Sequence, residues 1–301
     1  MRVPAKVNVQ LAVGGLRPDG FHDLANVFLA VGLYDEVTAT PSATLRLTAS
    51  GEDAHRIPLD EDNLAARAAR ALAAHHRLGD LPVHLHITKD IPVAGGMAGG
   101  SADAAGALLA CDTLWGTRTP HDELLALCAD LGSDVPFSLV GGTALGRGRG
   151  ERLTPLPTGG TFHWVFAVAE GGLSTPDVYR ECDRLREEAG TGATAADVPT
   201  PEPAPALLDA LRTGDPAALA PALANDLQPA ALSLRPSLAA TLTTGTSAGA
   251  LAGLVSGSGP TCAFLAADAE SAARIADALR SSGTCRTART TQGPAHGATL
   301  V

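Results

Sequence analysis

The sequence predicts a mixed α/β chain divided into two domains. Alternating apolar and polar side chains predict strands in the first half, over residues 3–13, 44–48 and 83–88. An alanine-rich stretch that ends near His76 predicts a helix between the last two of these strands. The composition changes at Pro157, after which residues 164–168 predict a new strand. We therefore expect an N-terminal domain over residues 1–157 and a C-terminal domain over residues 158–301.

The composition is that of a folded chain without a nucleic-acid surface. With 301 residues, of which 45% are hydrophobic, the chain can bury one large core or two moderate ones. The net charge of −10 argues against nucleic acid as a partner, because such binding requires clustered lysine and arginine. The five cysteines are scattered and form no Cys-x-x-Cys pair, so we expect reduced core thiols. Neither a signal peptide nor a membrane-spanning stretch is visible, so we expect a cytoplasmic protein without membrane contact.

The most informative stretch covers residues 92–106, where four glycines precede a segment with helical periodicity. Glycine lets the backbone approach a ligand closely and a helix N-terminus attracts anions, so we expect a phosphate-binding loop. We expect Ser101 to cap the helix and Gly116 to end it. No Gly-Lys-Ser or Gly-Lys-Thr occurs and G-x-G-x-x-G does not fit, which excludes the P-loop and the Rossmann loop. The alternative is an ordinary glycine-rich turn.

Only two of the 22 basic residues are lysines, Lys6 and Lys89. Arginine cannot replace lysine where a compact, strongly hydrated charge is needed, so this bias favours a chemical role for both; chance placement is the alternative. Lys6 shares the polar face of a predicted edge strand with Asn8 and Gln10, and this face could line a cleft. Lys89 ends the predicted strand that leads into the glycine loop, where its ammonium could meet a phosphate.

Two further polar residues, Asp134 and His22, lie in constrained positions. Asp134 follows Gly132, which we expect to end a helix capped at Thr119, and precedes Pro136, which we expect to lead a strand. A carboxylate held so rigidly suits a general base, with an ordinary turn aspartate as the alternative. His22 follows a glycine-rich turn, where a surface histidine is usual, although its ring could also read the edge of a base.

Turn-rich segments separate the predicted elements in both halves. Residues 146–150 alternate glycine with arginine and predict a basic hairpin tip, which we expect to be solvated rather than anion-binding. Residues 187–206 lack apolar periodicity and predict a mobile loop. A second glycine loop at residues 254–261 precedes a strand predicted over residues 262–266, and it brings further backbone N–H groups to a turn.

Five motifs occur in an order that resembles the GHMP kinases, and the match covers nearly the whole chain. They lie at residues 4–8, 92–105, 132–136, 225–229 and 256–260. The Pro-Ala-Lys-Val-Asn opening, the turn at residues 17–22 and the lengthened glycine loop are similar to one branch of the family. That branch phosphorylates a cytidyl diphosphate substrate in the non-mevalonate route to isoprenoid precursors. The resemblance implies a two-domain GHMP kinase fold, with an α/β N-terminal domain, an α+β C-terminal domain and an active site in the interdomain cleft.

The resemblance also implies roles for residues of this sequence. Lys6 and Asp134 would be the catalytic pair of an ATP-dependent transferase that uses ATP and Mg²⁺, with the metal ligands unassigned. The triphosphate of ATP would be bound by Pro92, Val93, Ala94, Gly95, Gly96, Met97, Ala98, Gly99, Gly100, Ser101 and Ala102. The rest of the nucleotide would lie near Asn63, Leu64 and Lys89. The small-molecule partner, a cytidyl diphosphate, would be bound by Asn8, Phe21, His22, Thr175 and Tyr179. The chain would be a monomer or a homodimer.

Three residues depart from the pattern of this family. Phe21 stands where many relatives have tyrosine, which keeps a stacking surface but loses a hydroxyl group. Ala98 replaces a glycine, and Asp103 replaces an asparagine in the first part of the predicted helix. A carboxylate at Asp103 would bring negative charge toward the phosphates, so we expect it to point away from them or toward a cation.

Two alternative functions stay open at this point. The first is a GHMP kinase for another small alcohol, such as homoserine or mevalonate phosphate; the combination of Phe21, His22 and Tyr179 disfavours it, because these rings suit a base. The second is a catalytically silent ligand sensor on the same fold. The intact pair of Lys6 and Asp134 argues against the sensor.

Overall fold

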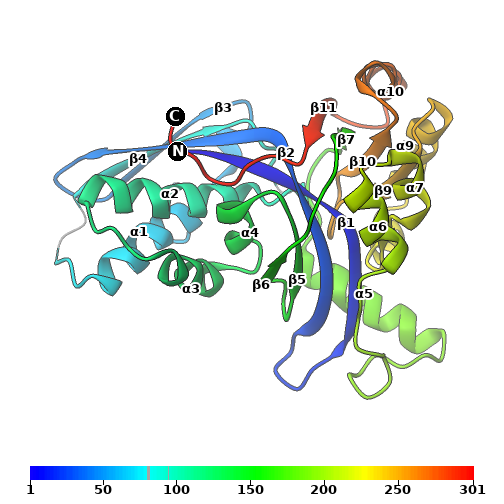
Figure 1. Cartoon of the computed structure of the whole chain (residues 1–301), viewed down its shortest axis with the longest axis horizontal. Helices are drawn as coiled ribbons and strands as arrows, with labels where there is room; N and C mark the ends of the chain where they lie inside the picture. The colour runs from blue at the N-terminus through cyan, green and yellow to red at the C-terminus, as the bar shows by residue number, and fades with distance from the viewer. Residues whose placement is uncertain (80–81, 94) are drawn as a thin grey trace.

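The computed structural model describes residues 1–79, 82–93 and 95–301, and within them the chain forms two β-sheets flanked by helices (Figure 1). The first sheet has the strand order β3-β4-β2-β1-β8, with β5 paired to β2 and β6 paired to β5. Its strands are β1 (Arg2–Leu16), β2 (His22–Pro41), β3 (Arg46–Gly51), β4 (Val83–Lys89), β5 (Thr143–Arg147), β6 (Arg152–Pro155) and β8 (Ala224–Asn225). The second sheet, in the order β11-β7-β10-β9, contains β7 (Phe162–Val168), β9 (Ala252–Val255), β10 (Cys262–Ala266) and β11 (Thr287–Gly293).

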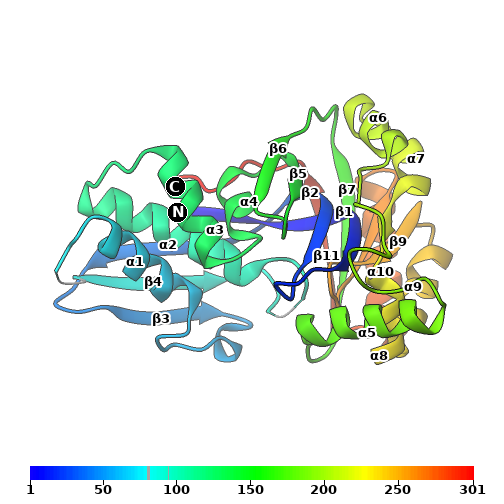
Figure 2. The ribbon, with the colours of Figure 1, turned by 90° about the horizontal axis from the view of Figure 1, so that it is seen from below.

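Helices pack against both sheets, as the mixed α/β prediction requires (Figure 2). Beside the first sheet lie α1 (Leu64–His75), α2 (Gly99–Trp115), α3 (His121–Leu131) and α4 (Val135–Val140). Around the second sheet lie α5 (Thr175–Glu188), α6 (Pro205–Thr213), α7 (Pro216–Leu219), α8 (Gln228–Leu234), α9 (Ser237–Ser247) and α10 (Ala269–Ser282). Throughout the described ranges, no helix is both long enough and apolar enough to cross a lipid bilayer.

The long strand β1 is next to last in the order of the first sheet. It pairs antiparallel with β2 along one edge, and at Gln10 and Leu11 it pairs in parallel with the two-residue strand β8 along the other. The prediction of an edge strand is therefore wrong at Gln10 and Leu11, where a segment from far along the chain pairs with β1. The predicted alternation is confirmed as far as Val9, because Val7 and Val9 belong to the main core whereas Lys6 and Asn8 line a cleft. It is wrong beyond the register shift between Asn8 and Gln10, since Leu11 lines the cleft and the Gln10 side chain bonds to the backbone of residues 202 and 204 instead.

Helix α2 begins three residues earlier than predicted, because its N-cap is Ala98 rather than Ser101. It starts at Gly99, and Ala98 occupies the N-cap position with a left-handed φ of +62° and no side-chain cap. Ser101 lies in the first turn, so the prediction that Ser101 caps the helix is wrong. The predicted end is confirmed, because Gly116 follows the helix with φ of +67°.

The segment that follows Asp134 is helical rather than extended. Helix α4 has Asp134 at its N-cap position and Pro136 in its first turn. Proline loses no hydrogen bond in a first turn and has a φ preset for a helix, so the expected strand is not formed. The preceding helix α3 begins one residue later than predicted, after Pro120 rather than after Thr119.

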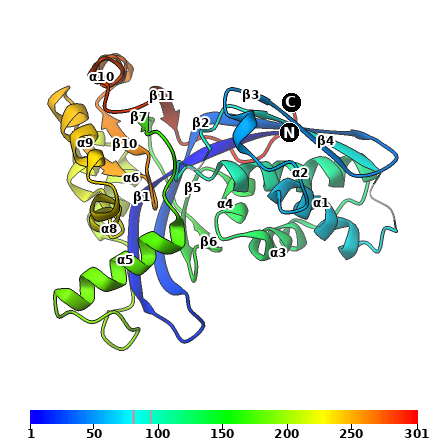
Figure 3. The ribbon, with the colours of Figure 1, turned by 180° about the vertical axis from the view of Figure 1, so that it is seen from behind.

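The expected loop over residues 187–206 connects α5 to α6 and is tied to the β1–β2 hairpin. The N–H group of Leu16 donates to the carbonyl of Ala193 over 2.7 Å, and the carbonyl of Leu16 accepts from the N–H group of Ala195 over 3.0 Å. Figure 3 shows this segment beside the end of the hairpin. The loop therefore borders the end of β1, just before the β1–β2 turn.

The domain boundary expected after residue 157 falls between β6 and β7, the last strand of the first half and the first strand of the second sheet. Backbone pairing also crosses this point, since β8 joins the first sheet and Thr299 exchanges two hydrogen bonds with Arg2. The division into residues 1–157 and 158–301 stays a prediction.

All five cysteines are free thiols, as their scattered positions predict. Cys111, Cys128, Cys182 and Cys262 are buried, and Cys285 is half-buried. Burial raises the pKa of Cys111 and of Cys128 to about 12, so these two side chains are neutral members of the core.

Candidate active site

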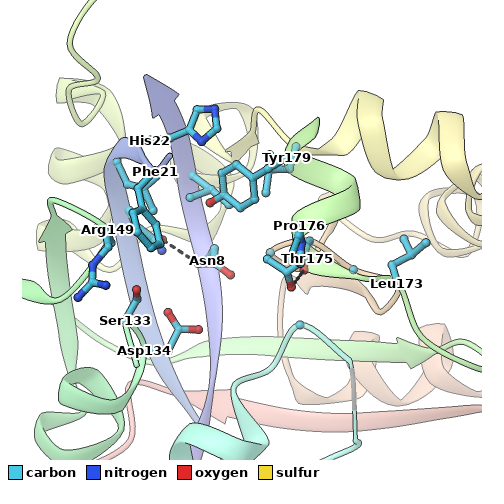
Figure 4. A pocket seen from close by; sticks show the side chains of 18 of the residues that line it. Asn8, Phe21, His22, Ser133, Asp134, Arg149, Leu173, Thr175, Pro176 and Tyr179 are labelled. Carbon is cyan, nitrogen blue, oxygen red and sulfur yellow. Dashed lines mark hydrogen bonds between the residues drawn. The ribbon is translucent and has the colours of Figure 1, made fainter. Parts of the chain in front are cut away.

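A cleft of about 750 Å³ opens between the β1–β2 hairpin, the glycine loop and helix α5 (Figure 4). Lys6 and Asn8 reach the cleft from β1. Gly96 reaches it from the glycine loop, and Ser101 reaches it from the first turn of α2. The second half of the chain supplies α5 and, from the second glycine loop, residues 257–259. Residues from both halves thus form one cavity.

The Lys6 ammonium is the centre of the polar contacts in this cleft. It donates to the Asn8 side-chain oxygen over 2.6 Å and to the Gly96 carbonyl over 2.9 Å, and it lies 3.5 Å from an Asp134 carboxylate oxygen. Lys6 is only 4% exposed, whereas the Asp134 side chain is 31% exposed. A buried ammonium requires such partners, so Lys6 fixes the positions of β1, the glycine loop and Asp134 relative to one another.

The two glycine loops pack directly against each other. A Cβ on Gly96, which has φ of +70°, would lie 2.0 Å from the carbonyl oxygen of Ser256, so only glycine fits there. The hydroxyl of Ser256 donates to the Gly96 carbonyl over 3.1 Å, the same carbonyl that Lys6 contacts. The loop at residues 254–261 thus holds the first glycine loop in place.

The first turn of α2 carries backbone N–H groups that have no partner inside the helix. The first helical hydrogen bond runs from the Ala102 N–H group to the Ala98 carbonyl, over 2.8 Å. The N–H groups of Gly99, Gly100 and Ser101 precede it, as the orphan donors of every helix N-terminus do. Because Ala98 and Ser101 line the cleft, this end of α2 can bind an anion there.

The structure brings about half of the expected site residues together. Those that line the cleft are Lys6, Asn8, Phe21, His22, Gly96, Ala98, Ser101, Asp134, Thr175 and Tyr179. Those outside its lining are Asn63, Leu64, Lys89, Pro92, Val93, Gly95, Met97, Gly99, Gly100 and Ala102. Ala94 lies outside the described residues. Asn63 instead caps α1, where its side chain accepts from the Ala65 N–H group over 2.9 Å.

Lys89 points into the protein rather than into the cleft. Its ammonium pairs with the carboxylates of Asp35 and Asp103, at 2.8 Å from the latter, and all three residues are buried. A Cβ on Gly99 would lie 3.2 Å from this ammonium, so the cluster sits directly under the start of α2. Asp103 therefore points toward a cation, one of the two orientations expected for it.

The titration of the Lys89 cluster reflects its burial. Burial alone would lower the pKa of Lys89, but the charges of Asp103 and Asp35 outweigh it and raise this pKa. Burial, with the charge of Asp35 adding to it, raises the pKa of Asp103 to about 7 against the opposing effect of Lys89. One oxygen of Asp103 is buried without a hydrogen-bond partner in the described residues, which agrees with a carboxylate that ionises reluctantly.

Aromatic rings gather at the other end of the cleft. The His22 ring lies 5.0 Å from that of Tyr179, and its Nε2 is 3.0 Å from a carboxylate oxygen of Asp183. Phe21 is 48% exposed, so it is not a core residue, and it faces Tyr179 across the cleft (Figure 4). Burial, followed by the charge of Asp134, raises the pKa of Tyr179, whose hydroxyl is therefore neutral at physiological pH.

Sequence reasoning missed several residues that line the cleft: Asn26, Ser133, Arg149, Asp183 and Ser258. The sequence did indicate Arg149 as part of a basic hairpin at residues 146–150, but we expected this hairpin to be solvated. Its guanidinium instead lies 5.1 Å above the ring of Phe21. Ser258 bonds Thr175 over 2.9 Å, and Asn26 accepts from the Asn8 side chain over 2.7 Å. Neither of these two contacts follows from a local pattern.

Comparison with known proteins identifies two matching family models and full-length relatives. The model of the GHMP kinases N terminal domain matches residues 63–142, and that of the GHMP kinases C terminal domain matches residues 207–285. A protein of Streptomyces avermitilis named 4-diphosphocytidyl-2-C-methyl-D-erythritol kinase is 70% identical, over 100% of this chain and 99% of its own length. Its counterpart of the same name from Streptomyces coelicolor is 69% identical, over 100% of this chain and 98% of its own length.

Solved structures agree with this assignment of the fold. The crystal structure of a 4-(cytidine 5'-diphospho)-2C-methyl-D-erythritol kinase is 33% identical and covers 98% of this chain and 100% of that one, with a TM-score of 0.77. A homoserine kinase from Cytophaga hutchinsonii has a TM-score of 0.71 over 97% of this chain and 92% of its own, at 20% identity. At that identity the likeness concerns the fold alone.

The raised pKa of Asp103 predicts a pH-dependent loss of stability. The Asp103 carboxyl group stays protonated up to about pH 7 in the folded chain, whereas an unfolded aspartate loses its proton near pH 4. The contribution of Asp103 to the free energy of unfolding is therefore greatest below about pH 4, and it is lost as the pH rises through about 7. Asp103→Asn cannot ionise, so its free energy of unfolding should fall less between pH 5 and pH 8 than that of the unmodified protein. Urea unfolding at the two pH values measures this difference, with Asp130→Asn at an exposed aspartate as the control. The same pH dependence in all three proteins would contradict the prediction.

Proposed function

The chain belongs to the GHMP kinase family, and on this premise we propose that it transfers a phosphoryl group from ATP to the 2-hydroxyl group of 4-diphosphocytidyl-2-C-methyl-D-erythritol. The reaction is a step in non-mevalonate isoprenoid precursor synthesis. One observation carries the proposal: a single cleft joins the Lys6–Asp134 pair and the start of α2 to a cluster of aromatic rings. The full-length relatives at 70% and 69% identity carry the name of this activity.

The glycine loop and the first turn of α2 are the proposed site for the phosphates of ATP. The unpaired N–H groups of Gly99, Gly100 and Ser101 and the positive end of the helix dipole support this placement. Mg²⁺ fits the same end of the cleft, because it prefers oxygen ligands and usually binds through one or two protein groups together with phosphates. The Ser101 hydroxyl is such a group, and a bound Mg²⁺ would neutralise phosphate charge there.

Asp134 is the proposed general base. It would accept the proton of the attacking hydroxyl group, whose oxygen then bonds to the γ-phosphorus of ATP while the bond from that phosphorus to the β–γ bridging oxygen breaks and ADP leaves. Lys6 offsets the charge of this carboxylate from 3.5 Å and also donates to Gly96 in the glycine loop. A single ammonium thus aligns the base with the proposed phosphate site, and phosphoryl transfer depends mainly on such alignment and on charge stabilisation.

The aromatic end of the cleft is the proposed site for cytosine. Phe21 and Tyr179 offer flat surfaces on which a base can stack, and His22 can bond to the edge of the base. Arg149 adds a positive charge beside Phe21 that suits the diphosphate of the substrate. Homoserine has neither a base nor a diphosphate, so this end of the cleft favours the cytidyl compound.

The choice of substrate can be tested by ADP release with three alcohols. We expect turnover with 4-diphosphocytidyl-2-C-methyl-D-erythritol and a kcat/KM lower by at least about 10³-fold with homoserine or phosphomevalonate, because both lack the base. Preference for either of the other two alcohols would reject the proposed substrate. No turnover with any of them, together with measurable ligand binding, would favour a silent sensor.

Replacement of the proposed base tests the mechanism. Asp134→Asn keeps the size of the side chain but cannot take a proton, so kcat should fall by roughly 10²-fold or more while KM for ATP changes by only a few fold. Steady-state kinetics measures both constants. Asp130→Asn makes the same chemical change at an exposed position near the end of α3 and should leave kcat unchanged. Near-normal turnover of Asp134→Asn would remove this residue from the mechanism.

Replacement of Tyr179 tests the cytosine site. Stacking on an aromatic ring contributes about 1–3 kcal/mol per base, so Tyr179→Ala should raise KM for the cytidyl substrate by roughly 10-fold or more. KM for ATP should change little, and Tyr179→Phe, which keeps the ring, should stay close to the unmodified protein. An equal rise in both KM values for Tyr179→Ala would instead point to a general structural role.

A further inference from the structure

Two arginines of the second sheet reach across to the segment that leads into the glycine loop. Arg286 directly precedes β11 and donates to both carboxylate oxygens of Asp53, over 2.7 and 2.8 Å. Arg289, on β11 itself, contacts both carboxylate oxygens of Asp90 over 2.8 and 2.9 Å. Asp53 and Asp90 belong to the first half of the chain, so these ion pairs connect the two halves away from the cleft.

The stem of the glycine loop, residues 90–93, includes Asp90 and is contacted by the Asp53 carboxylate. Asp53 accepts a hydrogen bond from the Val93 N–H group over 3.3 Å. Asp90 is fixed through its own N–H group, which donates to Asp35 over 2.7 Å, next to the Lys89 cluster. Both ends of the stem are therefore attached to acidic side chains, and at each end an arginine from the second half is part of the contact.

The pair formed by Arg286 and Asp53 is the more protected of the two. The Asp53 side chain is 8% exposed and that of Arg286 is 20% exposed, against 51% and 32% for Asp90 and Arg289. The backbone N–H group of Arg286 also donates to the Val168 carbonyl over 2.7 Å, which anchors the arginine on the second sheet. A planar guanidinium that contacts both oxygens of a carboxylate fixes orientation as well as distance.

The charge of Asp53 persists over the whole physiological pH range. The Arg286 guanidinium lowers the pKa of Asp53 to about 2, with the Val93 N–H group as a further contributor and burial acting in the opposite direction. Arg56 also approaches this carboxylate, at 3.5 Å, and Glu52 lies 3.9 Å from Arg286. The contact is thus a permanent part of the folded chain rather than a pH switch.

We propose that Arg286 and Asp53 are positioning residues that hold the stem of the glycine loop against the second sheet, and that this contact sets the affinity for ATP but not for the alcohol substrate. The proposal rests on the proposed function, because it takes the glycine loop as the site of the ATP phosphates. Neither residue lines the cleft, so any effect must pass through Val93 and the loop. The aromatic end of the cleft, built on the β1–β2 hairpin and α5, does not depend on this contact.

Steady-state kinetics of Arg286→Ala tests the consequence for ATP. We expect KM for ATP to rise by about 10-fold, with KM for the cytidyl substrate unchanged within about twofold, because only the phosphate end of the cleft loses its support. Arg286→Lys keeps the charge but cannot bind both carboxylate oxygens in one plane, so its KM for ATP should lie between those of the unmodified protein and Arg286→Ala. Arg274→Ala removes an exposed arginine of α10 that pairs with Glu270, and it should change neither constant. Equal increases in the two KM values for Arg286→Ala would overturn the proposal.

Hydrogen exchange of the free protein tests the positioning role without any substrate. The N–H groups of Asp90, Ile91, Val93 and Ala102, which all have acceptors in the structure, should exchange faster in Arg286→Ala than in Arg274→Ala, since the stem has lost one of its anchors. Asp53→Asn can still accept from Val93 but loses the ion pair, so it should show the same change to a smaller extent and serves if Arg286→Ala does not fold. Unchanged exchange in both Arg286→Ala and Asp53→Asn would overturn the proposal. If the unmodified protein showed no phosphoryl transfer, the proposed function would fail, whereas faster exchange would still support the anchoring of the stem.

Discussion

The candidate site depends above all on one buried ammonium group. Lys6 is almost fully removed from solvent, and its contacts with Asn8, Gly96 and Asp134 join β1, the glycine loop and the start of α4. A buried ammonium without partners would be costly, so these contacts hold the three elements together. The same contacts place a carboxylate beside the first turn of α2, whose N–H groups have no partner inside the helix, and the proposed phosphoryl transfer uses this arrangement.

A chain with a net charge of −10 that acts on ATP must keep its own carboxylates from repelling the phosphates. Four aspartates surround the stem of the glycine loop and the start of α2, and each is paired with a cation: Asp35 and Asp103 with Lys89, Asp53 with Arg286, and Asp90 with Arg289. Their charges thus serve to hold the loop and the helix. The rarity of lysine in the sequence acquires a physical meaning from these contacts, since both lysines are buried ion-pair partners rather than exposed charges.

The two ends of the cleft differ in their chemistry. The end at α2 is built from backbone and small side chains, which suits the phosphates of ATP in the proposed function. The opposite end is built from Phe21, His22, Tyr179 and Arg149, which lie on the β1–β2 hairpin, on α5 and on the β5–β6 turn. Because one fold can carry many specificities, the proposal assigns the choice of alcohol to these side chains rather than to the scaffold.

The sequence by itself determined the elements whose signals are local. The alternation along β1 as far as Val9, the end of the alanine-rich helix near His76 and the helix end at Gly116 all follow from contacts within a few residues, as do the two glycine loops. Family motifs then pointed to Lys6, Asp134 and the aromatic residues. Only the tertiary structure decided that β8 pairs with β1 at Gln10 and Leu11, that Lys89 turns inward to two carboxylates and that Arg149 lines the cleft. Each of these outcomes depends on partners distant in the chain, and a local pattern carries no information about which distant side chain will neutralise a charge or cover an edge.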